Sequence, residues 1–339
     1  MLQEKFLHLT QQFKTIRKMK LITKFTEEKF LKTNNRIINK FDKKLKSAQM
    51  ILKEILFPSN DRILTKLSLA TSKSLKYRSG YADECIASAV ELINGCLLLH
   101  TRIMEPQIKK NTKQLTGLLN VLFGDYILTK AFDFLVDTKS IEVLKIISTA
   151  SYLVTSGYVR ELSIRKKLET PIDIYLTSLD ERSGALFSSA CQSAAVISNA
   201  GKKEFKAFEK YGFNLGVAYQ IINDSYIYFN SKTLNIDQLY NYKSKICLPI
   251  LLSYQTSNAS EKEFWDQMIN NSYLNKKNYN KSLAILQKHE SIYATSQIVK
   301  KYLDRAVKSL FDLDDDIEVD CFIDLANYIY NKNFNFSKI

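Results

Sequence analysis

Nine glycines and four prolines in 339 residues leave this chain very few of the residues that make turns. A β-sandwich or barrel needs many Gly- and Pro-containing turns, and a doubly wound α/β sheet needs glycine loops. Hydrophobic residues make up 45% of the chain, which is enough for a substantial core. No uncharged apolar run reaches the roughly 18 residues of a transmembrane helix. The composition therefore predicts an all-α protein and argues against an ordinary membrane span.

Apolar side chains recur at helical spacing along the chain. The clearest run alternates steps of three and four, which places its members on one face of one helix: Phe205, Phe208, Gly212, Leu215, Tyr219, Ile222 and Tyr226. We expect ten or more helices around one central cavity, including a single helix over 172–199. The predicted organisation is a basic extension at 1–25 and one helical domain at 26–339.

Positive charge is concentrated at the start of the chain, whose formal net charge is +14. Between Lys5 and Lys24 there are six basic residues and no acid, with apolar residues interleaved. Such a stretch serves as an organelle-targeting presequence, a contact with anionic membranes, a nucleic-acid arm or simply a solvated first helix. The residues leave these alternatives open, although scarce arginine weighs against targeting. The expected location is mitochondrial if the source is a eukaryote, and cytoplasmic otherwise.

The five cysteines are scattered among apolar neighbours and show no C-x-x-C spacing. We therefore expect buried, reduced thiols, and the three dispersed histidines suggest no metal cluster. The acidic run at 312–320 lacks the glycine and the ligand spacing of a calcium loop. It is predicted to be a solvated connection between two helices.

Five segments, in this order along the chain, carry distinctive patterns: ELINGCLLLH at 91–100, FGDYILTKAF at 123–132, ERSGALFSSACQ at 181–192, YGFNLGVAYQIINDSYIY at 211–228 and KSKICLP at 243–249. Together they resemble the trans-polyprenyl diphosphate synthase family, over roughly residues 55–332. The resemblance implies an isoprenoid-synthase-type helical bundle around a deep cavity, usually dimeric, whose central helices correspond to about 113–150 here. It also implies a prenyltransferase that ionises an allylic diphosphate and adds isopentenyl diphosphate.

In that family two D-D-x-x-D motifs on facing helices hold magnesium ions that bridge the allylic diphosphate. Aspartates at i, i+1 and i+4 put two carboxylates on one helix face, and Mg²⁺ prefers carboxylate and phosphate oxygens. Here the first motif falls on 101–105, where only Glu105 is acidic, and the second on 223–227, where only Asp224 is acidic. We regard these two residues as remnants of metal sites. No catalytic residue is assigned, and Mg²⁺ is implied only if the chain is active.

The isopentenyl diphosphate pocket departs from the family as well. The family's G-G-K-R-x-R-P segment falls on 59–65, which keeps Arg62 and adds Asp61, and the family's histidine is replaced by Asn94. Other cations and hydrogen-bond donors persist at positions that match the family's diphosphate-binding residues. The predicted diphosphate-binding set is Arg62, Lys109, Lys110, Arg182, Ser183, Gln220, Lys232 and Lys245.

Loss of both aspartate motifs within an intact helical frame resembles the non-catalytic second subunits of heteromeric long-chain prenyl diphosphate synthases. This implies an accessory or regulatory subunit in isoprenoid biosynthesis, in the pathway that makes the polyprenyl side chain of ubiquinone. The expected partner is an aspartate-intact synthase subunit or a second copy of the chain, with an isoprenoid diphosphate as ligand and no nucleic acid. Two alternatives stay open: a divergent active prenyltransferase that uses Glu105 and Asp224, and a lipid- or partner-binding protein that shares the fold.

Overall fold

The computed structural model describes residues 20–42, 62–102, 117–229, 246–270 and 275–334. Within these ranges every regular element is helical, so the prediction of an all-α protein with ten or more helices is confirmed. The chain divides into two compact units. Unit 1 comprises Met1–Tyr152, Leu186–Gly212 and Val307–Leu325, and unit 2 comprises Leu153–Ala185, Phe213–Ala306 and Ala326–Ile339.

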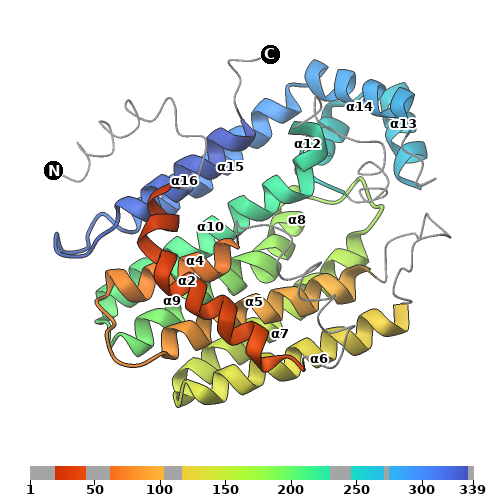
Figure 1. The fold of residues 1–339 in the computed structure, drawn as a ribbon. Helices are drawn as coiled ribbons and strands as arrows, with labels where there is room; N and C mark the ends of the chain where they lie inside the picture. Colours follow the sequence, from red (N-terminus) through yellow and green to blue (C-terminus); the bar gives the residue numbers. More distant parts are fainter. Residues whose placement is uncertain (1–19, 43–61, 103–116, 230–245, 271–274, 335–339) are drawn as a thin grey trace. The chain divides into compact units, whose positions relative to one another are not determined.

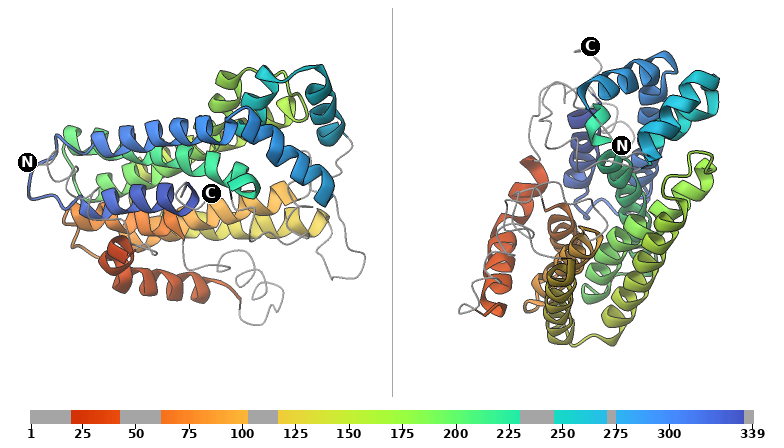
Figure 2. Two further views of the ribbon diagram at one scale, coloured as in Figure 1. Left: turned by 90° about the horizontal axis from the view of Figure 1, so that it is seen from above. Right: turned by 90° about the vertical axis from the view of Figure 1, so that its right-hand side faces the viewer.

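Unit 1 contains the helices of the first half of the chain. They are α2 (Lys20–Lys40), α4 (Ile63–Ser74), α5 (Ala82–Arg102) and α6 (Gly117–Asp137), with parts of α7 (Ile141–Ile164), α9 (Ala185–Ile197), α10 (Lys202–Phe229) and α16 (Asp320–Asn333). Helices α5 and α6 lie side by side (Figures 1 and 2). Ile86 and Val90 of α5 are fully buried, so helical spacing places its apolar face in the core.

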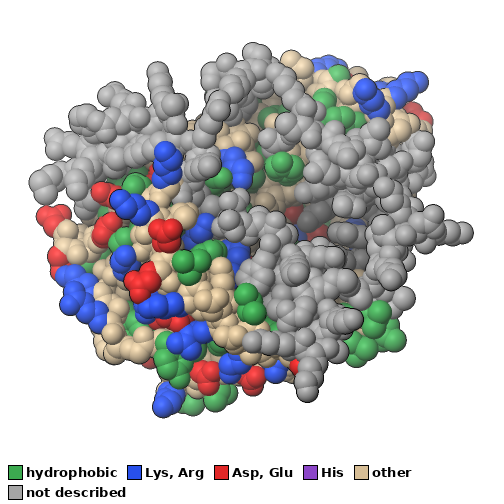
Figure 3. Space-filling view, in the orientation of Figure 1, with side chains coloured by type: hydrophobic (Ala, Val, Ile, Leu, Met, Phe, Trp, Pro, Cys, Tyr) green, Lys and Arg blue, Asp and Glu red, His purple; other side chains and the backbone are tan. Residues whose placement is uncertain are grey.

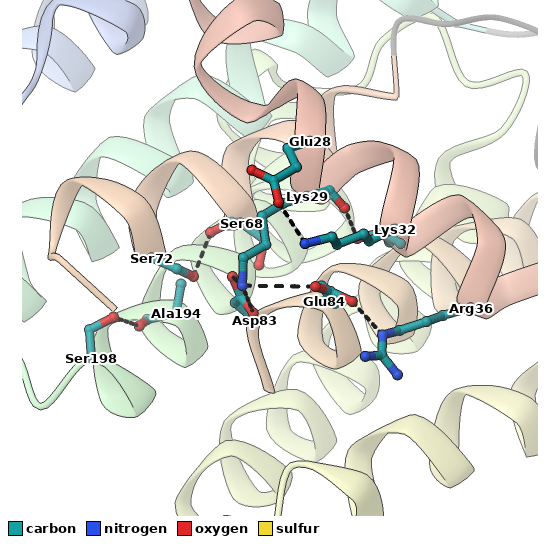
Figure 4. A network of polar contacts seen from close by, with 11 residues as sticks. Glu28, Lys29, Lys32, Arg36, Ser68, Ser72, Asp83, Glu84, Ala194 and Ser198 are labelled. Atoms are coloured by element: carbon teal, nitrogen blue, oxygen red, sulfur yellow. Dashed lines mark hydrogen bonds and ion pairs between the residues drawn. The ribbon is translucent and has the colours of Figure 1, made fainter. Parts of the chain in front are cut away.

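Ion pairs join α2 to the first turn of α5 (Figure 4). Lys29 Nζ lies 2.9 Å from Asp83 Oδ2 and 3.8 Å from Glu84 Oε1, and Arg36 pairs with Glu84. Burial raises the pKa of Asp83, although the hydrogen bond from Lys29 opposes this shift. The two carboxylates also complement the positive end of the α5 dipole. On the described part of the face seen in Figure 3, basic and acidic side chains are interspersed.

Unit 2 contains most helices of the second half of the chain. They are α8 (Ile172–Leu179), α12 (Leu248–Thr256), α13 (Ala259–Asn270), α14 (Lys276–Lys288) and most of α15 (Ser291–Lys308), with the remaining parts of α7, α10 and α16. Pro171 precedes α8 and Pro249 lies in the first turn of α12, positions where a missing N–H costs nothing. Trp265 of α13 is fully buried and anchors this core.

One predicted helix is helical as expected but contains a turn that the sequence did not reveal. The helix predicted over 172–199 is interrupted by a π-helical turn, η2 (Asp180–Gly184), which separates α8 from α9. A π-turn accommodates an extra residue within a helix, and apolar periodicity alone does not reveal it. Arg182, Ser183 and Gly184 are buried in this turn, so the interruption changes which side chains face the core.

The cysteines and the acidic run behave as the sequence predicts. All five cysteines are buried and unbridged, and burial raises the pKa of Cys85, Cys96 and Cys191 to about 12, which keeps these thiols protonated. The connection between α15 and α16 exposes its aspartates, of which Asp314 and Asp316 pair with lysines at the surface. None of the helices in the described ranges is long and apolar enough to cross a lipid bilayer.

Candidate functional site

The structure describes half of the residues predicted for the site. Glu105, Lys109, Lys110, Lys232 and Lys245 lie outside the described residues. Arg62 belongs to unit 1, whereas Arg182, Ser183, Gln220 and Asp224 belong to unit 2. Three of the residues in unit 2 meet in one polar network, which is the candidate site: Arg182 of η2, and Gln220 and Asp224 of α10.

A buried arginine lies between two carboxylates at the centre of this network. Arg182 Nη2 donates to Asp224 Oδ2 at 3.2 Å, and its Nη1 donates to Glu161 of α7. The side chains of Arg182 and Asp224 are 3% and 1% exposed, and that of Glu161 is 24% exposed. The guanidinium also lies 5.4 Å from the ring centroid of Tyr158, within the range of a cation–π contact. One cation therefore joins three helical segments.

Asp224 accepts further hydrogen bonds from protein side chains. The hydroxyl of Tyr175 donates to Oδ2 at 3.3 Å, and Gln220 Nε2 donates to Oδ1 at 2.7 Å. Burial, reinforced by the charge of Asp224, raises the pKa of Tyr175 well above its ordinary value, so its hydroxyl stays protonated as a donor. Burial opposes the charged form of Arg182, but Asp224 and Glu161 outweigh it, and the pKa of Arg182 is raised. Arg182 therefore stays protonated beside these carboxyl groups.

Two glycines allow the π-turn to pack this closely between α7 and α10. A Cβ atom on Gly157 of α7 would lie 2.7 Å from Arg182 Cγ and 2.8 Å from the Arg182 backbone nitrogen. A Cβ atom on Gly184 would lie 2.9 Å from the Phe213 ring of α10. Real Cβ contacts of this length essentially never occur, so a side chain at either position would displace the turn. Because Gly157 and Gly184 have no side chains, they leave the space in which the π-turn and Arg182 lie.

The carboxyl of Asp180, the first residue of η2, has a raised pKa. One of its oxygens, Oδ1, is buried and has no hydrogen-bond partner among the described residues. Burial, with a smaller contribution from the charge of Glu181, raises the pKa of Asp180 to about 6. This carboxyl therefore changes its charge in mildly acidic solution.

Arg62 makes a different set of contacts, all within unit 1. Its Nη2 donates to Thr65 Oγ1 at 3.1 Å, its Nη1 donates to Asn34 Oδ1, and its Nε lies 3.6 Å from Glu91 Oε2. The guanidinium lies 5.2 Å from the ring centroid of Phe30. Burial lowers the pKa of Arg62, and the charge of Glu91 opposes this shift. These contacts connect α2, α4 and α5, which gives Arg62 a structural role, and its role in diphosphate binding stays a prediction.

The first two sequence segments of the resemblance pack against each other in unit 1. A Cβ atom on Gly124 of α6 would clash with His100 Nε2 of α5, so the imidazole occupies the space that the glycine leaves open. The same nitrogen lies 3.3 Å from Asp125 Oδ1. This contact lies near the end of α5, immediately before Thr101, where the first aspartate motif would begin.

Sequence reasoning missed several members of these networks. Glu161 and Tyr175 complete the surroundings of Arg182 and Asp224, and Glu91 accepts a hydrogen bond from Thr65 at 2.6 Å. For Glu161 a signal exists, because it follows Gly157 by one helical turn and so shares its face of α7. Tyr175 carries no such signal, since an aromatic residue in a short apolar helix is ordinary core.

The network around Arg182 and Asp224 contains charged side chains, but the described part of the chain provides no metal site. There, no group of three or more His, Cys, Asp or Glu side chains is placed to bind a metal ion. The oxygens of Asp224 already accept hydrogen bonds from Arg182, Tyr175 and Gln220. The network therefore stabilises the surroundings of η2, and its cation faces two carboxylates of the protein.

Comparisons with known proteins agree with the resemblance. The family model described as polyprenyl synthetase matches residues 46–286. The octaprenyl diphosphate synthase of Haemophilus influenzae is 24% identical over 322 residues, which cover 92% of this chain and 97% of that protein. Solanesyl-diphosphate synthase 1, mitochondrial, of Oryza sativa subsp. japonica is 24% identical over 271 residues, which cover 78% of this chain and 61% of that protein.

Solved structures show the same fold. The decaprenyl diphosphate synthase from Rhodobacter capsulatus matches with a TM-score of 0.82 at 24% identity, covering 94% of this chain and 100% of that one. The polyprenyl synthase from Caulobacter crescentus CB15, complexed with calcium and isoprenyl diphosphate, matches with a TM-score of 0.83 at 22% identity, covering 95% of this chain and 100% of that one.

Proposed function

This chain belongs to the polyprenyl synthetase family, and from that membership we propose that it is an accessory or regulatory subunit of a long-chain prenyl diphosphate synthase. Its substrate class is the isoprenoid diphosphates, and its pathway makes the polyprenyl side chain of ubiquinone. Relatives named octaprenyl and solanesyl diphosphate synthases support the long-chain class. The name of the rice relative and the basic first residues support a mitochondrial location if the source is a eukaryote.

The observation that carries the proposal is the state of Asp224. It is the only carboxylate left in the second aspartate motif, and it is buried in an ion pair with Arg182. Ionising an allylic diphosphate requires strong stabilisation of the leaving anion, and losing one such stabilising group typically costs a factor of about 10²–10³ in rate. A site that keeps cations and hydrogen-bond donors can still hold a diphosphate by charge-assisted hydrogen bonds. Binding without ionisation fits the accessory role proposed for this chain.

Exposed apolar residues on α6 and at the start of α7 support the proposal that the chain binds a partner subunit. Large apolar residues lie exposed at helical spacing along one face of α6: Leu118 (69% exposed), Leu122 (55%), Phe132 (50%) and Val136 (71%). On the part of α7 that belongs to unit 1, Ile141 and Tyr152 are also exposed. Large apolar residues exposed along one face of a helix are typical of an interface with another protein. Ile127 of the same helix is fully buried in the core of unit 1, so α6 presents a different face to solvent.

The proposal is tested by expressing the chain alone and together with an aspartate-intact prenyl diphosphate synthase from the same genome. Each chain and the co-purified pair are assayed for Mg²⁺-dependent elongation of farnesyl and geranylgeranyl diphosphate with isopentenyl diphosphate. We expect co-purification, no product from this chain alone, and more or longer product from the pair than from the partner alone. Robust elongation by the single chain would favour a divergent enzyme, and failure to pair would favour a binding protein that shares the fold.

A further inference from the structure

Three polar side chains of unit 2, from α12, α13 and the end of α14, form a chain of hydroxyl, imidazole and carboxylate. Thr256 Oγ1, on the last residue of α12, lies 2.9 Å from His289 Nδ1. The other ring nitrogen, Nε2, lies 3.0 Å from Oε2 of Glu261 in the first turn of α13. In this order of groups, a base is placed beside a nucleophile and a carboxylate orients the base.

Helix ends hold the carboxylate and the imidazole in place. Glu261 and Asn258 form a capping box, in which Asn258 N donates to Glu261 Oε2 and Glu261 N donates to Asn258 Oδ1, both at 3.0 Å. Lys288 Nζ donates to Glu261 Oε1 at 2.7 Å. His289 follows the last residue of α14, and its backbone N–H donates to Ile285 O. The side chains of Glu261 and His289 are only 13% and 11% exposed, so both are held against the protein.

These contacts determine which ring nitrogen accepts a hydrogen bond. Hydrogen bonds, that from Lys288 foremost, lower the pKa of Glu261 to about 2, so this residue is an ionised acceptor at neutral pH. An ionised carboxylate accepts from a proton-bearing Nε2, which leaves Nδ1 of the neutral imidazole as the acceptor for the Thr256 hydroxyl. The other acceptors near that hydroxyl are farther away, Ser253 O at 3.2 Å and Leu252 O at 3.5 Å.

We propose that Thr256 is an acylation site, a nucleophilic hydroxyl that takes an acyl group from an activated ester with His289 as its general base. Oγ1 bonds to the carbonyl carbon of the donor, and its proton moves to Nδ1. The bond between that carbon and the leaving oxygen breaks, and the leaving group takes the proton from the imidazole. The products are a threonine ester and a free alcohol, and Glu261 acts as a positioning residue that orients the ring.

The position of Thr256 limits what this site does. The residue is exposed, so a donor in solution reaches its hydroxyl. It ends α12, and a helix C-terminus presents carbonyls, not the N–H donors of an oxyanion hole, so we expect a single acylation without rapid turnover. This inference goes beyond the accessory-subunit proposal, because it involves neither a diphosphate nor a partner.

The test treats the purified full-length chain with p-nitrophenyl acetate and follows acetylation of each residue by peptide mass spectrometry. Alkaline hydroxylamine removes acetyl esters from hydroxyls and leaves the acetyl amides of lysines, which separates the two kinds of product. Ser163 of α7 is the internal control, because its exposed hydroxyl donates to Arg160 O at 2.7 Å and has an intrinsically less hindered oxygen than threonine. The matched control for Glu261→Gln is Glu263→Gln, an exposed position on the same helix.

We expect the ester at Thr256 to form at least about tenfold faster than at Ser163, since a general base typically contributes a factor of about 10²–10⁴. His289→Gln should slow acetylation of Thr256 by about tenfold or more and leave Ser163 unchanged. Glu261→Gln should slow it as well, whereas Glu263→Gln should not. Adding Glu261→Gln to His289→Gln should cause no further loss, because the carboxylate acts only through the imidazole.

Chemical rescue separates a base from a structural contact. In His289→Ala, imidazole added to the solution should restore acetylation at Thr256 more than at Ser163, because the free base enters the space of the missing ring. A lost reaction that imidazole does not restore would show that His289 has only a structural role and would contradict the inference.

Two further results would overturn the inference: equal rates at Thr256 and Ser163 in the unaltered chain, or an unchanged rate at Thr256 in His289→Gln. The first comparison needs no variant, so it decides even if a substitution prevents folding. All these readouts use one chain, so their failure is distinguishable from a failure to pair with a synthase.

Discussion

Gly157 of α7 lies against the backbone of Arg182, and a Cβ atom added to it would be 2.8 Å from the Arg182 nitrogen. In a helix interior, Gly→Ala ordinarily stabilises by about 1 kcal/mol through helix propensity. Here the neighbour is backbone, which cannot move aside as the end of a flexible side chain can. We therefore expect Gly157→Ala to lower the free energy of unfolding by about 1–3 kcal/mol in denaturant titrations, as overpacking does.

The adjacent Ser156→Ala variant is the control for this experiment. Ser156 is half-buried on the same helix, and the change also raises helix propensity, so stability should stay equal or rise. If Gly157→Ala proves as stable as Ser156→Ala, the close approach of α7 to η2 does not constrain the position of Arg182.

Breaking the buried Arg182–Asp224 ion pair should lower the free energy of unfolding far more than breaking an exposed ion pair. Asp224→Asn removes the charge that compensates Arg182, and we expect a loss of about 2–4 kcal/mol, because a buried cation then lacks one of its partners. The comparison is Asp304→Asn, which breaks the exposed Lys300–Asp304 pair of α15 at a cost of about 0.5 kcal/mol or less. Equal losses in urea or guanidinium unfolding would show that the pair at Asp224 has no special role.

Helical periodicity and the scarcity of turn residues were enough to predict the fold, because both depend on local patterns. The contact between Arg182 and Asp224 could not be predicted in the same way. The two residues are 42 positions apart in the sequence, and their meeting depends on a π-turn that shifts the register of the helix after Leu179. Aligning Arg182 with the family's diphosphate-binding lysine predicts a cation that is available to bind a ligand. In the structure, the side chain of Arg182 instead pairs with two carboxylates of the protein.

The same limit applies to Arg62. Its position in a degenerate basic segment suggested a role in binding diphosphate, but its contacts with Asn34 and Glu91 are formed with helices far away in the sequence. Its φ of 26° also lies in the left-handed region, a conformation that a non-glycine residue adopts only when its surroundings demand it. Neither property can be inferred from the residue types alone.

Asp180 should make stability depend on pH. Its folded pKa of about 6 exceeds the ordinary value of 3.8, so folding holds its proton more tightly than the unfolded chain does. The resulting destabilisation is fully present above pH 6, decreases as the pH falls towards 4, and is absent below the unfolded pKa. Asp180→Asn should therefore raise the free energy of unfolding at pH 7.5 by about 1 kcal/mol, a figure reduced for solvent screening of a partly exposed carboxyl.

The gain from Asp180→Asn should vanish near pH 4, where the folded carboxyl is already neutral. Asp315→Asn, in the exposed connection between α15 and α16, is the control and should leave stability unchanged at both pH values. Denaturant unfolding at pH 7.5 and pH 4 measures both variants. A gain of equal size at the two pH values would mean that shape or hydrogen bonding, and not the charge of Asp180, causes the effect.

The exposed apolar face of α6 gives the most direct test of the proposed partner surface. Phe132 is 50% exposed, so Phe132→Glu should fold with nearly unchanged stability while placing a charge in the contact. If this face binds an aspartate-intact synthase subunit, the affinity measured by titration or sizing should fall by about tenfold or more, because burying an unpaired charge at an interface is costly. Leu31→Glu on α2, where Leu31 is 57% exposed, should leave pairing intact. Equal pairing by both variants would place the partner elsewhere.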